Sequence, residues 1–153
     1  MKVQDLLNSK DNNTIYSVAP EHTVFEAVTE MVEKNVGAMM VTRDTNLIGV
    51  ITERDYLRLV TVQGKTARDT PVSAIMTRSV IYITPDTSVD EAMNIMTEKR
   101  VRHLPVLDDD CIVGVLSIGD LVKAKSEKSA MHIRTLQAYI ADGYPGPSTE
   151  AEA

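Results

Sequence analysis

Apolar residues recur at intervals of three and four in two segments of the chain, and each segment predicts a helix with one core-facing side. The two sets are Val24, Ala27, Val28, Met31 and Val32, and Val89, Ala92, Met93 and Met96. A hydroxyl residue precedes each set and Glu follows it three positions later, as Thr23 with Glu26 and Ser88 with Glu91. This pattern is a capping box, which satisfies free backbone N–H groups at a helix start. We therefore expect both helices to begin at these residues.

Short apolar runs around these helices predict strands. They cover residues 14–18, 38–42 and 47–52 in the first half, and residues 80–83, 104–107 and 111–116 in the second. Polar residues at 43–46 and 108–110 predict the hairpin turns between the last two strands of each half. A polar-headed helix follows, at 53–60 and at 118–124. Each half therefore predicts the order strand, helix, strand, strand, helix.

The two halves are a sequence repeat: Pro20 to Asp55 recurs without a gap as Pro85 to Asp120, an offset of 65 residues. A unit this short cannot bury a core alone, so the repeat predicts one pseudo-twofold body with matched clefts. The fold class is α/β (α+β). Such symmetry favours a binding module over an enzyme with a single site.

The repeat also predicts the domain boundaries. We expect a first domain at residues 1–66 and a second at 67–125, each led by a short amphipathic helix. A further amphipathic helix at 126–142 has no repeat partner, and it either caps the body or meets another subunit. The segment 143–153 predicts a disordered tail.

Composition narrows the function. The 153 residues carry a net charge of −6, which disfavours extended contact with nucleic acid. No apolar run reaches the length of a membrane span, and Met1 to Asp5 does not resemble a signal or transit peptide. We expect a cytoplasmic protein, or one of an organellar matrix if a presequence has been removed. Eight Met against one Phe predict an aliphatic core.

Several features that resemble reactive sites are better explained by structure. The three aspartates at 108–110 lack the glycine and distant Glu of an EF-hand and predict a turn. The triplet Gly-Lys-Thr at 64–66 lacks the Walker A glycine, because Leu59 stands in its place. Cys111, at the start of a strand, is expected to be a small buried hydrophobe rather than a redox thiol. No metal-ligand spacing or catalytic triad is recognisable, so we predict no metal, no catalytic residues and no enzyme.

The most informative motif is a strand that runs directly into a helix. It reads Gly-Val-Ile-Thr-Glu-Arg-Asp at residues 49–55 and Gly-Val-Leu-Ser-Ile-Gly-Asp at residues 114–120. One interpretation is a capping box alone. The other is a ligand site, because a helix N-terminus offers N–H groups to an anion and a carboxylate suits a vicinal diol such as ribose.

These motifs, with Arg-His-Leu-Pro-Val at residues 102–106, carry a family resemblance. The chain resembles a tandem pair of CBS domains, also called a Bateman module, over about residues 3–125. It is similar to the stand-alone CBS-pair proteins of bacteria and plant organelles. One such motif is a weak signal, and two at a fixed register are a strong one.

The resemblance implies an adenosyl ligand in clefts between two domains packed through their sheets. AMP is our first choice, and ADP, ATP, NAD(H) or S-adenosylmethionine are alternatives. Asp55 and Asp120 would hold ribose hydroxyls, with Thr52 and Ser117 beside ribose and phosphate. Other residues would line the adenine or face phosphate: Ile15, Tyr16, Gly37, Ala38, Met39 and Arg54 from the first copy, and Ile81, Tyr82, Arg102, His103, Leu104 and Pro105 from the second.

The copies differ at Gly37 and Arg102, at Ala38 and His103, and at Arg54 and Gly119, so the two clefts should be chemically unequal. The resemblance implies a non-catalytic sensor of adenylate or dinucleotide state, homodimeric, that changes shape to control a partner such as an enzyme. The alternative is a structural dimerisation protein with vestigial sites. An enzyme acting on a nucleotide would need a general base or metal cluster that the sequence does not reveal.

Overall fold

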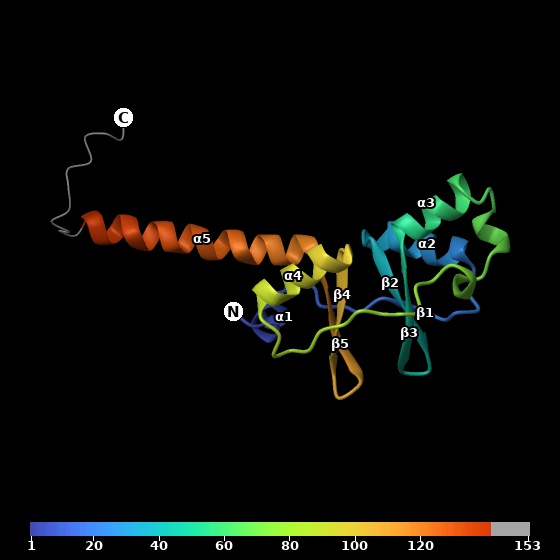
Figure 1. Cartoon of the computed structure of the whole chain (residues 1–153), viewed down its shortest axis with the longest axis horizontal. Helices are drawn as coiled ribbons and strands as arrows, with labels where there is room; N and C mark the ends of the chain where they lie inside the picture. The colour runs from blue at the N-terminus through green and yellow to red at the C-terminus, as the bar shows by residue number, and fades with distance from the viewer. Residues whose placement is uncertain (142–153) are drawn as a thin grey trace. The chain divides into compact units, whose positions relative to one another are not determined.

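Each repeat folds around a β-hairpin. The computed structural model describes residues 1–141. In the first repeat, β2 (Ala38–Arg43) pairs antiparallel with β3 (Asn46–Thr52), and a short β1 (Ser17–Val18) runs parallel to β2. In the second repeat, β4 (His103–Asp108) pairs antiparallel with β5 (Cys111–Ser117) (Figure 1). The predicted mixed α/β fold is confirmed.

The two hairpins share one register. Ala38 lies opposite Thr52 in the first, and His103 lies opposite Ser117 in the second. Each hairpin also has a register shift at the same place, after Val41 and after Val106. The sequence offset of 65 residues is therefore preserved in the backbone.

The helices start where the hydroxyl residues predict. Thr23 Oγ1 accepts a hydrogen bond of 3.1 Å from the Glu26 N–H at the start of α2 (Val24–Lys34). Ser88 Oγ accepts one of 3.0 Å from the Glu91 N–H at the start of α4 (Val89–Lys99). Both helices end at a residue with left-handed backbone, φ 55° in each case, which closes the last turn.

The first strand of each repeat is shorter than predicted. Tyr16 C=O accepts a 3.1 Å bond from Met40 N–H, which begins the parallel pairing of β1 with β2. Pro105 occupies the position of Met40 in the second repeat and has no N–H to donate, so the equivalent bond cannot form. The pairing there is reduced to a bridge between Ile83 and Val106.

The segment ahead of each repeat packs on the other repeat. Helix α1 (Val3–Ser9) precedes the first repeat, yet Val3 N–H donates to Thr87 C=O at 2.8 Å. The 3₁₀ helix η2 (Val72–Ala74) precedes the second repeat, yet Val72 N–H donates to His22 C=O at 2.8 Å. The two repeats are thereby tied together by crossed segments. The domain boundaries predicted after residues 66 and 125 stay predictions.

The motif glycines make room for these crossed segments. A Cβ built on Gly49 would lie 2.6 Å from Met76 Sδ and 3.0 Å from Thr77 O. A Cβ on Gly114 would lie 2.6 Å from Leu7 Cδ2. Both glycines are needed for close packing of the segment that crosses over from the other repeat.

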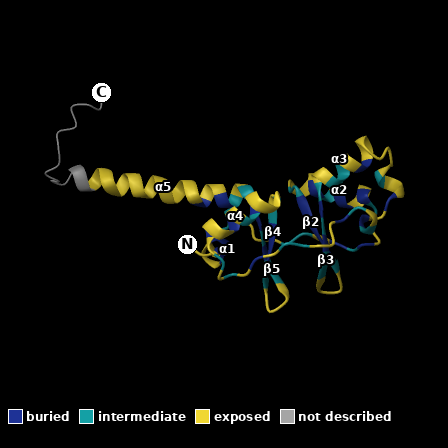
Figure 2. Ribbon diagram, in the orientation of Figure 1, coloured by how far each residue is buried: buried dark blue, intermediate teal, exposed yellow. Residues whose placement is uncertain are grey.

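Helix α3 (Glu53–Thr61) lies beside α2 on the three-stranded sheet, and the core beneath them is aliphatic. Met31 and Met39 are among its largest fully buried side chains, as the methionine content predicts. Figure 2 shows the buried positions on the strands and on the inner sides of the helices, with exposed residues along the hairpin tips.

The chain divides into two units, Met1–Ile118 and Gly119–Ala153. The described part of the second unit, residues 119–141, lies entirely within α5 (Ile118–Ala141), a single helix where the sequence predicted two. Only Lys125 separates the two predicted helices, and residues 120–141 contain no Gly or Pro to end a helix. The predicted tail at 143–153 lies outside the described residues. Among the helices of residues 1–141, none is both long and apolar enough to cross a bilayer.

Candidate functional site

The strand-to-helix turn of the first repeat is closed by Thr52 and Asp55. Asp55 Oδ2 accepts hydrogen bonds from Thr52 N–H at 2.8 Å and from Thr52 Oγ1 at 3.1 Å. Asp55 N–H donates to Thr52 Oγ1 at 3.4 Å. The capping-box interpretation of this motif is therefore correct for the first copy.

The capping box leaves half of the Asp55 carboxylate for another role. Both bonds from Thr52 go to Oδ2, and no other described residue is hydrogen-bonded to Oδ1. The residue is partly exposed, in the first turn of α3, where the Glu53 and Asp55 N–H groups are bonded to Gly37 C=O and Thr52 Oγ1. An acceptor oxygen is thus held in a fixed position on a turn that the protein itself rigidifies.

The second repeat reproduces the backbone of this turn. Glu53 N–H donates to Gly37 C=O at 3.1 Å, and at equivalent positions Ile118 N–H donates to Arg102 C=O at 2.8 Å. Ser117 ends β5 and is partly buried. Asp120 lies in the first turn of α5 and is also partly buried.

The residues predicted to line the adenine fall into two groups by burial. Met39 and Leu104 are 0% exposed and Ala38 and Pro105 are buried, so these four offer a ligand mainly their backbone. Ile15, Tyr16 and Ile81 are half-buried, whereas Tyr82 is 56% exposed. The accessible apolar surface predicted for adenine comes from this second group.

Residues of both repeats meet at Gly37. A Cβ built on Gly37 would lie 3.0 Å from Glu53 Oε1, 3.3 Å from His103 Cε1 and 3.4 Å from His103 Nε2. His103 therefore reaches from the start of β4 to the start of β2 in the other repeat. The sequence placed His103 with the second copy only.

Glu53 was not among the predicted site residues. It stands between Thr52 and Asp55, where it resembled an ordinary first residue of a helix. The signal that could have identified it is the contrast between copies, because its partner in the second repeat is the apolar Ile118.

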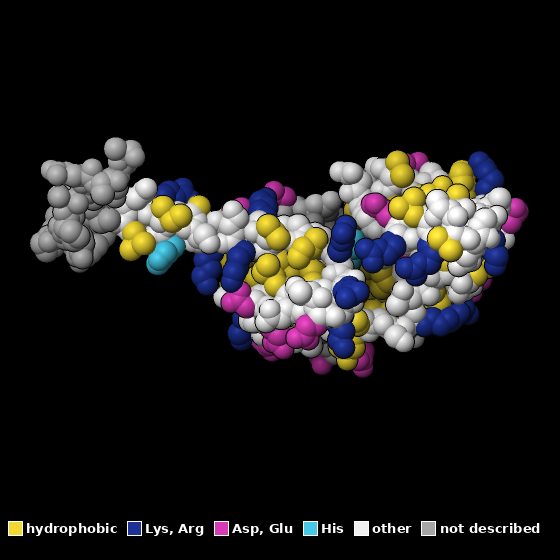
Figure 3. All heavy atoms as spheres, turned by 45° about the horizontal axis from the view of Figure 1, so that its top comes forward, with side chains coloured by type: hydrophobic (Ala, Val, Ile, Leu, Met, Phe, Trp, Pro, Cys, Tyr) yellow, Lys and Arg dark blue, Asp and Glu magenta, His cyan; other side chains and the backbone are white. Residues whose placement is uncertain are grey.

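Basic side chains gather on the face where the two repeats meet (Figure 3). Arg54 and Arg102, both predicted to face phosphate, are exposed at the start of α3 and just ahead of β4. Positive charge beside a helix N-terminus favours an anionic ligand.

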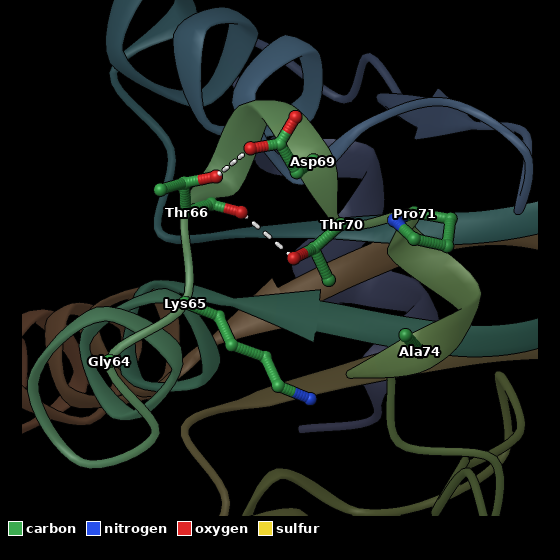
Figure 4. A pocket seen from close by; sticks show the side chains of 7 residues that line it. All are labelled: Gly64, Lys65, Thr66, Asp69, Thr70, Pro71 and Ala74. Atoms are coloured by element: carbon green, nitrogen blue, oxygen red, sulfur yellow. Dashed lines mark hydrogen bonds between the residues drawn. The ribbon is translucent and has the colours of Figure 1, made fainter.

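An open pocket of about 480 Å³ lies elsewhere, in the linker between the repeats. It is lined by residues 64–66, 69–71 and Ala74, and the Lys65 side chain extends along it (Figure 4). Thr66 and Thr70 hydroxyls are already bonded, to Asp69 Oδ2 at 2.6 Å and to Thr66 C=O at 2.8 Å. The triplet at 64–66 follows α3 and precedes a 3₁₀ helix of three residues, Ala67–Asp69, so it lacks the strand and long helix of a phosphate loop. This pocket contains none of the predicted site residues.

Two other predictions about reactive side chains meet different outcomes. Cys111 is exposed, so the expectation of a small buried hydrophobe is wrong: the residue sits at the hairpin tip, beyond the covered part of the sheet. Asp109 and Asp110 have φ values of 48° and 64°, as two residues of a tight hairpin turn require, which agrees with the turn interpretation. Within residues 1–141, no group of three acidic, His or Cys side chains is placed to hold a metal.

The fold and the turns define a tandem repeat module, with two copies of one helix–hairpin–helix unit and a strand-to-helix turn in each. The CBS domain model matches this chain twice, at residues 4–62 and 72–127. The chain belongs to the CBS domain family and carries a tandem pair.

Relatives and solved structures agree with this assignment. The mitochondrial CBS domain-containing protein CBSX3 of Arabidopsis thaliana is 40% identical over 150 residues, which cover 93% of this chain and 73% of that protein. A putative signal-transduction protein with CBS domains from Burkholderia ambifaria has a TM-score of 0.79 at 44% identity, covering 81% of this chain and 93% of that one. The CBS domain pair of protein MJ0100, crystallised with 5′-methylthioadenosine and S-adenosyl-L-methionine, shares the fold with a TM-score of 0.74 at 24% identity, covering 84% and 98%.

Proposed function

We propose that this protein is a non-catalytic regulatory module that binds an adenosyl ligand between its two CBS domains. The observation that carries the proposal is the Thr52–Asp55 turn, which fixes the Asp55 carboxylate through Oδ2 and leaves Oδ1 as an acceptor, next in sequence to the exposed Arg54. A fixed acceptor for ribose hydroxyls next to positive charge for phosphate suits a nucleotide.

Different residues contact the ribose, the phosphate and the adenine of the ligand. Asp55 accepts from the ribose hydroxyls, and Thr52 lies beside ribose and phosphate. The half-buried Ile15 and Tyr16 flank the adenine, and the buried strand residues meet its edge with their backbone. Arg54 faces the phosphate. In the second copy the motif assigns Ser117 and Asp120 the same roles, with Ile81, Tyr82 and Arg102 around the ligand.

The second repeat has a further backbone group for a ligand. Because Pro105 has no N–H, Ile81 C=O lacks the strand bond that Tyr16 C=O makes with Met40. A half-buried carbonyl without its ladder partner favours a donor such as the adenine amino group. AMP is our first choice of ligand, with ADP, ATP or NAD(H) as alternatives.

Ligand binding would regulate a partner through a change in the arrangement of the two repeats. Residues of both repeats meet at Gly37, Glu53 and His103, so a ligand there contacts both at once. A ligand that prefers one arrangement shifts the population toward it. The MJ0100 pair shows that this fold accommodates adenosyl compounds; for this chain the argument rests on its own residues.

We also propose that the module is a homodimer. Three exposed apolar side chains lie on neighbouring helices of the first repeat: Val32 of α2 at 76%, and Leu57 and Val60 of α3 at 57% and 40%. Exposed apolar side chains on neighbouring helices favour burial against a partner surface. If dimerisation were the whole function, the nucleotide sites would be vestigial, which is the alternative to the sensor.

A ligand screen by thermal denaturation tests the proposal. The full chain is melted with adenosine, AMP, ADP, ATP, NAD, NADH and S-adenosylmethionine, each up to millimolar concentration. A ligand that binds only the folded state raises the melting temperature. At one hundred times its Kd it adds about 2.7 kcal/mol to the free energy of unfolding. A flat response to all seven would support the alternative, a structural dimerisation protein. Release of a modified ligand, followed by chromatography, would reveal an enzyme instead.

A further inference from the structure

The two repeats place unlike charges at equivalent positions around the proposed sites. Around Gly37 stand Glu53 and His103. The offset of 65 residues maps Gly37 onto Arg102, Glu53 onto Ile118, and His103 back onto Ala38. The carboxylate of Glu53 thus corresponds to the apolar side chain of Ile118, and the imidazole of His103 corresponds to the methyl group of Ala38.

The backbone shows that this correspondence is structural. Gly37 and Arg102 accept the same hydrogen bond, from Glu53 N–H at 3.1 Å and from Ile118 N–H at 2.8 Å. Arg102 therefore places a guanidinium-bearing side chain where Gly37 leaves only hydrogen. At Gly37 even a methyl group would press on Glu53 Oε1 at 3.0 Å.

We propose that Glu53 makes the site of the first repeat select against ligands with several phosphates, while Arg102 makes the site of the second repeat accept them. This inference rests on the proposed function. The first site would take an adenosyl ligand of low negative charge, such as adenosine or a nucleoside monophosphate. The second would take a nucleoside di- or triphosphate.

The charges near each turn support this division. In the first repeat the start of α3 carries both a carboxylate and a guanidinium, on the exposed residues Glu53 and Arg54. In the second repeat the same two positions are Ile118 and Gly119, so the guanidinium of Arg102 is not opposed from them. An arginine stays protonated at all working pH values, so Arg102 gives the second repeat a permanent positive charge at a position where the first repeat has Gly37.

Calorimetric titration of adenosine, AMP and ATP into the full chain tests the inference. The variants are Glu53→Gln, which removes the charge and keeps the shape, and Arg102→Gln. Glu33→Gln is the matched control, because Glu33 is an exposed carboxylate of α2 outside the proposed sites. Circular dichroism and the melting temperature show that each variant is folded.

The expected result is a change in selectivity. Glu53→Gln should increase the ATP affinity of the weaker site, in the first repeat, about three- to tenfold at low salt, because a negative charge near the phosphates is removed. The adenosine affinity should stay unchanged. Arg102→Gln should lower the ATP affinity of the stronger site, in the second repeat, by a similar factor. Glu33→Gln should change the ATP affinity of neither site.

Two outcomes overturn the inference in distinguishable ways. If the wild-type chain binds none of the three ligands, the proposed function fails, and charge selection fails with it. If the wild type binds but Glu53→Gln changes adenosine and ATP affinity equally, or neither, the proposed function stands and Glu53 does not select by charge.

Discussion

Thr52 and Asp55 hold each other through three hydrogen bonds, two of which end on the same carboxylate oxygen, Asp55 Oδ2. The arrangement separates two roles within one side chain. Oδ2 stabilises the start of α3, and Oδ1 makes no hydrogen bond to another described residue. A substitution at Asp55 should therefore affect stability and ligand binding by different amounts, depending on which oxygen it preserves.

Asp55→Ala removes both oxygens. We expect it to lower the free energy of unfolding by about 1 kcal/mol, the scale of a lost helix cap, and ligand affinity by about 1.5–3 kcal/mol, the scale of a hydrogen bond to a charged group. Asp55→Asn can keep an oxygen acceptor for Thr52 N–H, so it should retain more stability and still lose affinity. Urea denaturation and calorimetric titration measure the two effects.

Thr23→Ala is the matched control for this pair. Thr23 caps α2 with one 3.1 Å bond to the Glu26 N–H and is not among the proposed site residues. Its loss should destabilise the fold by about 1 kcal/mol and leave ligand affinity unchanged. Equal losses of affinity in Thr23→Ala and Asp55→Ala would indicate that affinity merely follows stability.

The motif glycines give a second prediction. Gly49→Ala should destabilise the protein by about 1–3 kcal/mol, the cost of overpacking a tight interior, because its Cβ meets backbone at Thr77 O as well as Met76 Sδ. Gly114→Ala should cost less, since its Cβ meets mainly the flexible ends of Leu7 and Asn13. Thermal and urea denaturation of the two variants would contradict this account if Gly114→Ala proved the more damaging.

A compensating substitution checks the cause. Met76→Ala removes the side chain that the Gly49→Ala methyl group would strike at 2.6 Å. The double variant should therefore lose less stability than the two single losses added together, as expected for residues in contact. Strict additivity would show that the clash is not what destabilises Gly49→Ala.

The sequence predicts the hairpins, the helix starts and the family because each depends on local patterns. Thr23, Ser88 and Thr52 act on N–H groups three residues away, which any reader of the chain can locate. The repeat then doubles each signal. Helix caps and hairpins that recur at a fixed offset can therefore be predicted from the sequence alone.

What the sequence does not show is contact between distant segments. The structure places the Met76 side chain against Gly49, and no pattern around residue 49 indicates this contact. His103 was assigned to one copy, although it reaches Gly37 in the other. The sequence does not indicate Glu53 as a site residue, because only the structure places it beside Gly37 together with His103. Each of these follows from how the two repeats meet, which no spacing within one repeat encodes.

The crossed segments give the last prediction, because each should protect the repeat that it does not precede. Leu7→Ala empties a buried position of α1, and such truncations cost about 2–5 kcal/mol. Hydrogen exchange should then rise at residues 84–90 of the second repeat, where α1 is bonded, more than at residues 20–24 of the first. Val72→Ala, which empties a buried position of η2, is the reciprocal variant and should give the opposite pattern. If each substitution instead loosened the repeat that follows it in the chain, the segments would not be crossed in solution.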